Sequence, residues 1–349
     1  MDLSAFDLKG KVALITGGAH GIGFSIAEGM AKCGATICFN CSSEASLEKG
    51  MAAYKAAGID AHGYAADVSD EDAVNAMVAK IKAEVGPVDI LVNNAGLMKR
   101  VPMVEMSHAD FMRVIDVHVG GAFNCSKAVL PDMMEKHEGK IINICSMMSE
   151  LGRETVSAYA AAKGALKMLT KNIASEYGEY NIQCNGMGPG YIATAQTAPL
   201  REVQPDGSRH PFDQFITAKT PAGRWGDPED MVGPCVFLAS HASDFVNGQI
   251  LYADGASSPT SAVSPSKSDN RKALRDAAGL LSCQSCQIRM PSQWSSSCWM
   301  ISAVQPEKVL MRGWNFSFCH CTLMVWNRLV FRVPVRERQP PPFRTARTF

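Results

Sequence analysis

The sequence predicts an α/β domain in which helices cover both faces of a doubly wound parallel sheet. Three observations support this fold class. Short apolar runs, typical of strands buried on both faces, alternate with segments in which apolar residues recur at helical spacing. Glycines and asparagines follow several of these runs, at the point where a strand would end. Ligands of such sheets lie beyond the carboxyl ends of the strands, which is where the unusual motifs of this chain fall.

The first half of the domain contains four predicted strands. A strand over 11–16 (KVALIT) precedes a helix over 21–35, in which Ile22, Ile26 and Met30 share one face. A strand over 35–40 and a helix over 44–58 follow, the helix closed by a glycine. Residues 62–68 lead into a helix over 69–86, for which Ser69 is the predicted N-cap, and residues 87–96 give the fourth strand and its turn.

The second half continues the alternation. A long helical segment extends to about His137, and the strand 140–146 (KIINICS) is followed by a helix around Tyr159. Strands over 181–190 and 249–255 complete the sheet. Residues 195–224 form a long connection before a helix that starts near Pro228. Because a connection of this length is unusual in a compact domain, we interpret it as a lid.

The turn Thr16–Gly23 (TGGAHGIG) favours a dinucleotide ligand. Glycines let the backbone approach a pyrophosphate, and the following helix N-terminus supplies free N–H groups. A glycine-rich turn alone also occurs for structural reasons, but the strand–turn–helix context argues for the ligand. The spacing here is Gly-xxx-Gly-x-Gly rather than the Gly-x-Gly-xx-Gly of the best-known dinucleotide fingerprint.

Tyr159 and Lys163 lie one helical turn apart in an alanine-rich run, on the same face of the predicted helix. A lysine beside a tyrosine stabilises the phenolate and lowers the tyrosine pKa from about 10. Taken alone, the pair is also compatible with an exposed helix surface. Its surroundings decide between the two interpretations.

Five motifs in this order resemble the classical short-chain dehydrogenase/reductase family. They are Thr16–Gly23, Asn93-Asn94-Ala95-Gly96, Ser146, Tyr159-xxx-Lys163 and Pro189-Gly190. Ser146 and Tyr159 have the separation that this family uses. The resemblance covers residues 8–255 and implies a single Rossmann-type domain over 1–255.

The family resemblance implies a catalytic role for three residues. Tyr159 would be the general acid in ketone reduction and the general base in alcohol oxidation, and Lys163 would lower its pKa and bind the nicotinamide ribose. Ser146 would donate a hydrogen bond to the substrate oxygen. His118 occupies the place of an asparagine in the family's proton relay. It is either a relay member, whose titration near ~6.5 would enter the pH profile, or a packed residue without a catalytic role.

The resemblance also implies a set of cofactor-binding residues. They are Gly17, His20, Ile22, Gly23, Cys41, Ser42, Asp67, Val68, Asn94, Ala95, Gly96, Tyr159, Lys163, Pro189, Gly190, Ile192 and Thr194. The second strand carries no acid at its end before Glu44, so no carboxylate would repel a 2′-phosphate. This favours NADP, with NAD as the alternative because no arginine or lysine is present there.

Residues 144–164, together with GSRHPFDQF and AKTPAGRWG, are similar to the gluconate 5-dehydrogenases of that family, also called 5-keto-D-gluconate 5-reductases. The similarity implies that D-gluconate and 5-keto-D-gluconate are interconverted by hydride transfer. A sugar acid needs a cation for its carboxylate, and Arg100 and Arg153 are the candidates, with Ser146 as a further substrate contact. Arg153 has Glu150 and Glu154 as alternative partners.

Two other kinds of function stay open beside this one. The first is reduction of another keto-sugar or of a 3-keto acyl substrate. The second is a dinucleotide-binding regulator without turnover, against which the intact Ser146–Tyr159–Lys163 set argues.

The tail, residues 256–349, differs in composition from the rest. It has 13 lysines and arginines against 4 acidic residues, and four of the five tryptophans of the chain. Cys283, Cys286, Cys319 and Cys321 could be combined into a zinc site, but nothing periodic surrounds them. The tail matches no nucleic-acid-binding module. We expect a disordered segment that is not a natural domain, and neither a metal nor nucleic acid as a ligand.

Other features bear on location and assembly. The charged start of the chain leads directly into a strand, and no apolar run reaches the ~20 residues that a membrane helix needs. The seven cysteines before residue 256 are isolated, as expected of buried free thiols in the cytoplasm. The family resemblance implies a homo-tetramer. In place of the family's second glycine and apolar ending, this chain continues from Gly255 with Ala-Ser-Ser-Pro.

Overall fold

This computed structural model describes residues 3–257, 299–302 and 322–325. The chain divides between Val263 and Ser264 into two units. In the second unit, strand β8 (Trp299–Ser302) pairs antiparallel with β9 (Thr322–Val325). The predictions of disorder and of a cysteine cluster in the tail fall on residues outside the described ranges.

The first unit contains a seven-stranded parallel sheet, which confirms the predicted fold class. Its strands are β1 (Val12–Ile15), β2 (Thr36–Cys41), β3 (Ala61–Ala65), β4 (Ile90–Asn93), β5 (Gly139–Ile144), β6 (Ile182–Pro189) and β7 (Ile250–Ala253). They lie in the order β3-β2-β1-β4-β5-β6-β7 and all pair in parallel. The strand order reverses between β1 and β4, with β2 and β3 on one side and β5 to β7 on the other, which is where such sheets open a crevice for a ligand.

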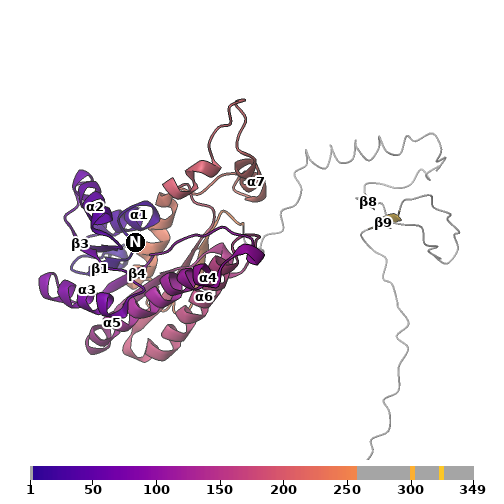
Figure 1. Cartoon of the computed structure of the whole chain (residues 1–349). Helices are drawn as coiled ribbons and strands as arrows, with labels where there is room; N and C mark the ends of the chain where they lie inside the picture. Colours follow the sequence, from indigo (N-terminus) through magenta and orange to yellow (C-terminus); the bar gives the residue numbers. More distant parts are fainter. Residues whose placement is uncertain (1–2, 258–298, 303–321, 326–349) are drawn as a thin grey trace, which may run out of the picture. The chain divides into compact units, whose positions relative to one another are not determined.

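Helices cover both faces of this sheet (Figure 1). One face carries α1 (Gly21–Lys32), α2 (Glu44–Ala56) and α8 (Val232–Ala239). The other carries α3 (Glu71–Glu84), α5 (Gly121–Lys136) and α6 (Ser157–Tyr177). Within β1, Ala13 and Ile15 pack in the first core cluster, whereas Val12 and Leu14 pack in the second. Successive side chains of a strand point to opposite faces, so an all-apolar run serves both cores.

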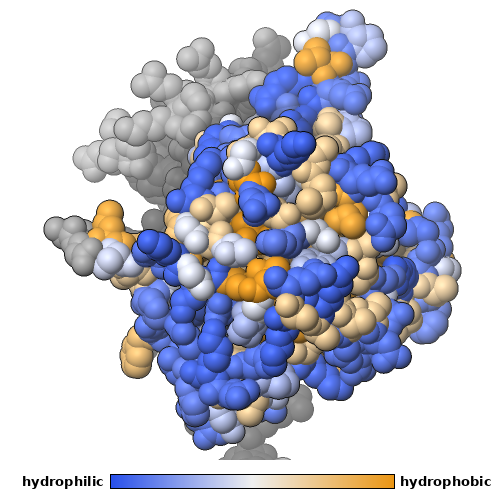
Figure 2. All heavy atoms as spheres, turned by 90° about the vertical axis from the view of Figure 1, so that its left-hand side faces the viewer, coloured by the Kyte–Doolittle hydropathy of each residue, from blue (hydrophilic) through white to orange (hydrophobic). Residues whose placement is uncertain are grey.

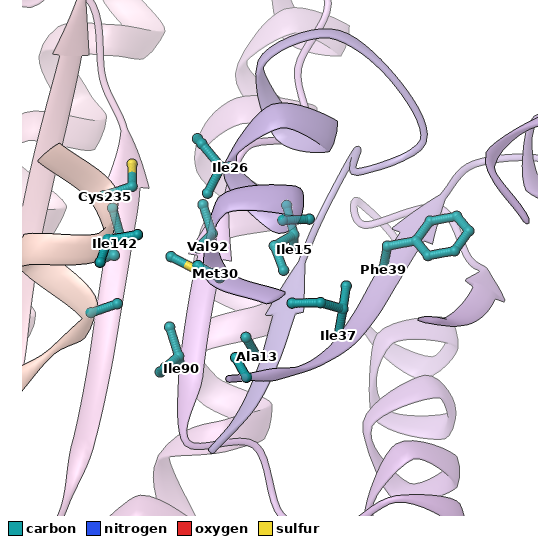
Figure 3. Packing of buried hydrophobic residues seen from close by; sticks show 14 of the residues in the cluster. Ala13, Ile15, Ile26, Met30, Ile37, Phe39, Ile90, Val92, Ile142 and Cys235 are labelled. Carbon is teal, nitrogen blue, oxygen red and sulfur yellow. The ribbon is translucent and has the colours of Figure 1, made fainter. Parts of the chain in front are cut away.

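The first core cluster fixes α1 against the sheet. Ile26 and Met30 are fully buried, and Figure 3 shows them beside Ile15 and Val92 of the central strands. Ile22, predicted to share their face, is partly buried against the same cluster. Because α1 begins where the turn after β1 ends, this packing also fixes the position of its N-terminus.

The N-cap of α3 is Asp70, so the prediction of Ser69 was wrong by one residue. The Asp70 carboxylate accepts hydrogen bonds from the backbone N–H groups of Asp72 and Ala73. The hydroxyl of Ser69 instead donates to the Asp67 carboxylate at 2.7 Å. A nearby acid therefore takes the serine hydroxyl that would otherwise cap the helix.

The helical segment that ends near His137 is interrupted by a π-helical turn. Helix α4 (His108–Ile115) passes into the π-helix η3 (Asp116–Gly120), which continues as α5 up to Lys136. Between β4 and α4 the chain forms a loop that contains the 3-10 turn η2 (Met103–Glu105). π-Turns inside helices often occur at functional sites, and η3 contains His118.

The connection 195–224 has structure of its own. It contains the 3-10 helix η6 (Ala195–Leu200) and the helix α7 (Pro211–Lys219). The helix predicted near Pro228 begins as the 3-10 turn η7 (Pro228–Met231) and continues as α8. The role of the connection as a lid stays a prediction.

Four further 3-10 turns complete the first unit. They are η1 (Ser4–Phe6), η4 (Met147–Ser149), η5 (Gly178–Tyr180) and η8 (His241–Ser243). The seven cysteines before residue 256 are free thiols as predicted, and all but Cys33 are buried.

The surface seen in Figure 2 is mostly hydrophilic, with apolar residues in small groups. Scattered exposed apolar residues are normal for a folded domain. Among the residues that the structure describes, no helix combines the length and the apolar character needed to cross a membrane.

Candidate active site

One cavity of about 560 Å³ lies at the carboxyl ends of the strands, and every residue assigned to the site from the sequence lines it. The assigned residues come from the last positions of β2 and β6, from the segments that follow β1 to β6, and from helices α1, η3 and α6. A volume of this size is typical of small-molecule and cofactor sites. The fold therefore brings together residues that lie up to 177 positions apart in the chain, from Gly17 to Thr194.

The turn after β1 is built from glycines that no larger residue could replace. Gly17 has a φ of +61°, and a Cβ there would lie 2.9 Å from the Ala95 Cα atom. A Cβ on Gly23 would lie 2.5 Å from Nδ2 of Asn94. The turn after β1 and the turn after β4 are thus in direct contact, which leaves room only for backbone at this point.

Side-chain hydrogen bonds hold these two turns together. The Thr16 hydroxyl oxygen accepts from the backbone N–H groups of Asn94 and Ala95, both at 3.0 Å. The Asn94 amide donates to the carbonyl oxygens of Thr16 and Gly17 at 2.9 and 3.0 Å. The N-cap of α1, His20, makes no side-chain capping bond, and the first turn has no acidic residue. The first N–H groups of α1 therefore remain as donors for an anionic group such as a pyrophosphate.

The end of β2 forms the opposite end of the cavity. Cys41 and Ser42 line it together with Ser46 of α2, which the sequence analysis missed. Buried Asn40 fixes this edge, because its amide donates to the carbonyl oxygens of Cys41, Tyr64 and Ala66. Glu44, the first acid after β2, lies in α2 and is exposed. The residues here fit the adenosine end of a dinucleotide.

Asp67 lines the cavity but is held by its own chain. Its carboxylate accepts from Arg113 at 2.8 Å and from the hydroxyl of Ser69. Burial tends to raise the pKa of Asp67, but the hydrogen bonds from Ser69 and Arg113 outweigh it and lower the pKa. The charge of this carboxylate is therefore compensated. Arg113 lies on α4, 46 residues away, and no local signal in the sequence predicts the pair.

Ser146, Tyr159 and Lys163 meet on one wall of the cavity. Ser146 follows β5 and caps η4, where its hydroxyl oxygen accepts from the N–H group of Met148 at 3.1 Å. Tyr159 and Lys163 lie on the first turns of α6, with the Lys163 ammonium 5.5 Å from the centroid of the Tyr159 ring. The Lys163 Nζ atom donates to the Ile144 carbonyl oxygen at 2.5 Å.

The pKa of Tyr159 differs from the prediction. Burial raises it above the ordinary value, and the opposing effects of the Ser146 hydroxyl and of the charges on Arg100 and Arg153 are smaller. Burial likewise lowers the pKa of Lys163 to about 8. The prediction of an acidic tyrosine was therefore wrong for the chain alone, because burial of the Tyr159 hydroxyl outweighs the groups that lower its pKa. At neutral pH the tyrosine is protonated, which is the form that donates a proton to a ketone.

His118 is packed against Tyr159. Its ring lies edge-on to the Tyr159 ring at 5.3 Å, and its Nε2 atom lies 2.8 Å from the Leu97 carbonyl oxygen. Nδ1 is buried and has no hydrogen-bond partner among the described residues. Burial, with the neighbouring charge of Lys163, lowers the pKa of His118 to about 3. The expected titration near ~6.5 was wrong, and a catalytic role for this residue stays a prediction.

Arg100 and Arg153 lie at the mouth of the cavity around one aromatic ring. The Cζ atoms of their guanidinium groups are 5.8 and 5.3 Å from the centroid of Phe212, which belongs to α7. Arg153 also donates to the hydroxyl of Tyr191 at 2.7 Å. It does not pair with Glu150, since Lys167 and Tyr252 occupy that carboxylate. Sequence reasoning missed Tyr191 and Phe212, because only the fold places them beside the arginines.

The charges of the two arginines are not compensated by acidic side chains. In the part of the chain that the structure describes, no carboxylate lies within ion-pair distance of either guanidinium. Burial and the nearby charge of Arg153 lower the pKa of Arg100 from its ordinary value. Both groups stay cationic, because an arginine is not deprotonated in proteins. The mouth of the cavity therefore favours an anionic ligand.

Comparisons with known proteins agree with this geometry. A family model described as short chain dehydrogenase matches residues 11–205. The chain is similar to a 2-dehydro-3-deoxy-D-gluconate 5-dehydrogenase from Formosa agariphila, with 55% identity over 256 residues, or 73% of this chain and 95% of the relative.

Solved structures show the same similarity. The crystal structure of 2-keto-3-deoxy-D-gluconate dehydrogenase from Streptococcus agalactiae is 68% identical with a TM-score of 0.64, covering 72% of this chain and 94% of that one. A gluconate 5-dehydrogenase from Burkholderia cenocepacia, in complex with NADP and tartrate, is 41% identical with a TM-score of 0.69. It covers 75% of this chain and 99% of its own.

Proposed function

The chain belongs to the short-chain dehydrogenase/reductase family, and from that membership we propose that it is an NADP-dependent oxidoreductase of sugar acids. Its substrate pair is D-gluconate and 5-keto-D-gluconate, interconverted by hydride transfer at carbon 5. One observation carries this proposal. The cavity that contains Ser146, Tyr159 and Lys163 also exposes the guanidinium groups of Arg100 and Arg153, which have no carboxylate partner among the described residues.

A sugar acid accounts for this pair of cations. Its carboxylate lies several carbons from the reacting carbon, so a cation at the mouth of the cavity holds one end of the substrate while Tyr159 meets the other. The complex of the Burkholderia cenocepacia relative with tartrate, a hydroxy acid, supports an acidic substrate. A neutral ketose would leave both guanidinium groups without an anionic partner.

The three catalytic residues divide the work on the substrate oxygen. The nicotinamide cofactor supplies the hydride that reduces the ketone carbon. The Tyr159 hydroxyl donates its proton to the ketone oxygen, and the Ser146 hydroxyl donates a hydrogen bond to the same atom as charge develops on it. The Lys163 ammonium, buried beside the Tyr159 ring, stabilises the tyrosinate that remains. In alcohol oxidation the same groups act in reverse, with Tyr159 as the base.

NADP is the favoured cofactor in this proposal. The cavity wall near the end of β2 presents Cys41, Ser42 and Ser46, and Asp67 farther along already binds Arg113. A 2′-phosphate therefore meets hydroxyl groups rather than an uncompensated carboxylate. The relative that contains NADP supports the same choice.

A second candidate substrate is 2-dehydro-3-deoxy-D-gluconate. The relatives from Formosa agariphila and Streptococcus agalactiae, both more than half identical over the aligned residues, carry names that point to it. It has the same terminal carboxylate, and oxidation at carbon 5 would leave the roles of Arg100 and Tyr159 unchanged. The two candidates differ only at carbons 2 and 3.

The test is a substrate and cofactor comparison with the purified full chain. We measure the reduction of 5-keto-D-gluconate with each cofactor, with reduction of the neutral ketose D-fructose as the control. We also measure the oxidation of D-gluconate and of 2-dehydro-3-deoxy-D-gluconate with each cofactor. We expect a sugar acid to exceed the neutral ketose at least about tenfold in kcat/KM, as one charge-assisted hydrogen bond provides. Equal values for acid and neutral substrates would refute the proposal. The homo-tetramer and the cytoplasmic location stay predictions from the resemblance.

A further inference from the structure

Arg100 and Arg153 form a cluster of like charges at the mouth of the cavity. The guanidinium groups are close enough that each lies within cation–π distance, about 6 Å, of the same Phe212 ring. Two cations beside each other repel, and no acidic side chain of the described residues lies between them. A group other than a carboxylate must therefore hold the two guanidinium groups together while no anion is bound.

Aromatic rings supply that group. Arg153 lies 5.7 Å from the centroid of Tyr191 and donates to its hydroxyl, in addition to its contact with Phe212. The Phe212 ring is the aromatic contact of Arg100 at 5.8 Å. Because a ring face is negative, one ring that meets two cations offsets part of their repulsion. Phe212 is the group that the two arginines share.

Phe212 is held in place without help from the arginines. Its neighbour Asp213 is buried and accepts from the Trp225 indole N–H group at 2.7 Å and from Arg209 at 2.6 Å. The ring itself packs against Tyr191 and Trp225, with centroid distances of 5.9 and 6.3 Å. Helix α7 is therefore anchored by contacts that do not involve Arg100 or Arg153, and these contacts hold the Phe212 ring beside the two guanidinium groups.

We propose that Phe212 is a specificity-determining residue, whose ring holds Arg100 and Arg153 together as one clamp for the substrate carboxylate. The inference rests on the proposed sugar-acid function and adds to it a residue from the predicted lid. Phe212 does not line the cavity itself, so its role is to position the two cations that do. Loss of the ring lets them separate, and the carboxylate is then held by one cation at a time.

The test is a series of substitutions that separates the ring from its bulk. Phe212→Leu and Phe212→Met keep an apolar side chain without a ring face, whereas Phe212→Tyr keeps the ring. Phe245→Leu, on a fully exposed phenylalanine that does not line the cavity, is the matched control. For each variant, KM and kcat are measured with 5-keto-D-gluconate and with D-fructose. Cofactor affinity is measured by fluorescence titration, and folding is checked by thermal melting.

We expect Phe212→Leu and Phe212→Met to raise KM for the acid about fivefold to tenfold, the effect of losing one to two cation–π contacts. KM for D-fructose, kcat, and cofactor affinity should stay within about twofold, and Phe212→Tyr and Phe245→Leu should match the wild type. The comparison between ring and non-ring variants remains decisive if one of them folds poorly, since the other non-ring variant replaces it.

Two outcomes would overturn the inference alone. The first is an unchanged acid KM in both non-ring variants of an enzyme that prefers acids. The second is an equal rise in KM for acid and neutral substrates, which would show that Phe212 only packs. A wild-type enzyme without any preference for acids would instead refute the proposed function, and the clamp with it.

Discussion

The two ends of the cavity are held together by different kinds of contact. At the cofactor end, the side chains of Thr16 and Asn94 hydrogen-bond to backbone groups. Four such bonds of 2.9–3.0 Å join the turns after β1 and β4. At the substrate end, side chains from three separate segments meet around Phe212 through ring and charge contacts. Hydrogen bonds to the backbone fix the geometry of the cofactor end, whereas the substitution of one side chain can change the contacts of the substrate end. We therefore expect substrate preference and cofactor binding to respond to different substitutions.

The largest expected effect comes from Tyr159, which lines the cavity beside Lys163. Tyr159→Phe removes the proton donor and should reduce kcat by a factor of about 10²–10⁴, because general acid catalysis accelerates reactions by that factor. Cofactor affinity should stay within about twofold, since both the ring and Lys163 remain. Stopped-flow and titration experiments measure the two quantities.

Tyr180→Phe, outside the cavity, is the control for this change. If Tyr159→Phe keeps more than about a hundredth of the wild-type kcat, the tyrosine is not the general acid.

The next effect sharpens the comparison at the substrate end. Arg100→Ala should raise KM for the sugar acid about tenfold to a hundredfold, because a charge-assisted hydrogen bond contributes ~1.5–3 kcal/mol. The change removes binding of substrate and transition state alike, so kcat should fall less than KM rises. Steady-state kinetics with 5-keto-D-gluconate measure both.

Lys99→Ala is the matched control, since this neighbouring cation is exposed and pairs with Asp110. An equal loss for acid and neutral substrates in Arg100→Ala would mean that the arginine is structural.

At the cofactor end we expect a change in preference rather than a loss. Wild-type kcat/KM should be higher with NADPH than with NADH, and Cys41→Asp should reverse the order. A carboxylate at this edge of the cavity repels a 2′-phosphate and accepts from a ribose hydroxyl. Acid selectivity should be unchanged, because Cys41 and Arg100 lie at opposite ends. Kinetics with both cofactors, with Cys33→Asp as a control outside the cavity, decide the point.

A wild-type preference for NADH would contradict this prediction. A loss of acid selectivity in Cys41→Asp would show that the two ends are coupled.

The smallest effect concerns pH. The hydrogen bond from Arg209 lowers the pKa of Asp213, with the Trp225 indole acting in the same direction against burial. A carboxylate with a depressed folded-state pKa stabilises the fold above its unfolded pKa of about 4, and that contribution is lost as pH falls through the folded value. Trp225 fluorescence should therefore report a local change at α7 only below about pH 4.

In Asp213→Asn that acid transition should be absent, while the unfolding transition of the sheet stays where it was. The same acid transition in Asp213→Asn and in the wild type would assign it to another group.

Sequence patterns predicted the cofactor end far better than the substrate end. Thr16–Gly23 and Asn94–Gly96 follow buried strands directly, and parallel strands bring their carboxyl ends to one edge. Each of these residues lines the cavity except Thr16 and Gly18. Local sequence therefore determines this end of the site.

The substrate end depends on contacts over long separations. Arg100 and Arg153 were identified as candidates, but their shared contact with Phe212 spans 112 and 59 positions of the chain and leaves no local pattern. The pKa shifts of Tyr159 and His118 likewise differ from the prediction, because burial is the largest cause of both. Desolvation depends on everything packed around a group, and a spacing of four residues does not encode it.

The central claim is that the arginine pair makes this cavity a site for sugar acids, and one measurement tests it most directly. The ratio of kcat/KM for 5-keto-D-gluconate to that for D-fructose is compared between the wild type and the double variant Arg100→Ala, Arg153→Ala. We expect a ratio of at least about ten in the wild type to fall to near one in the double variant, with little change for D-fructose. A ratio that survives the loss of both arginines would contradict the account.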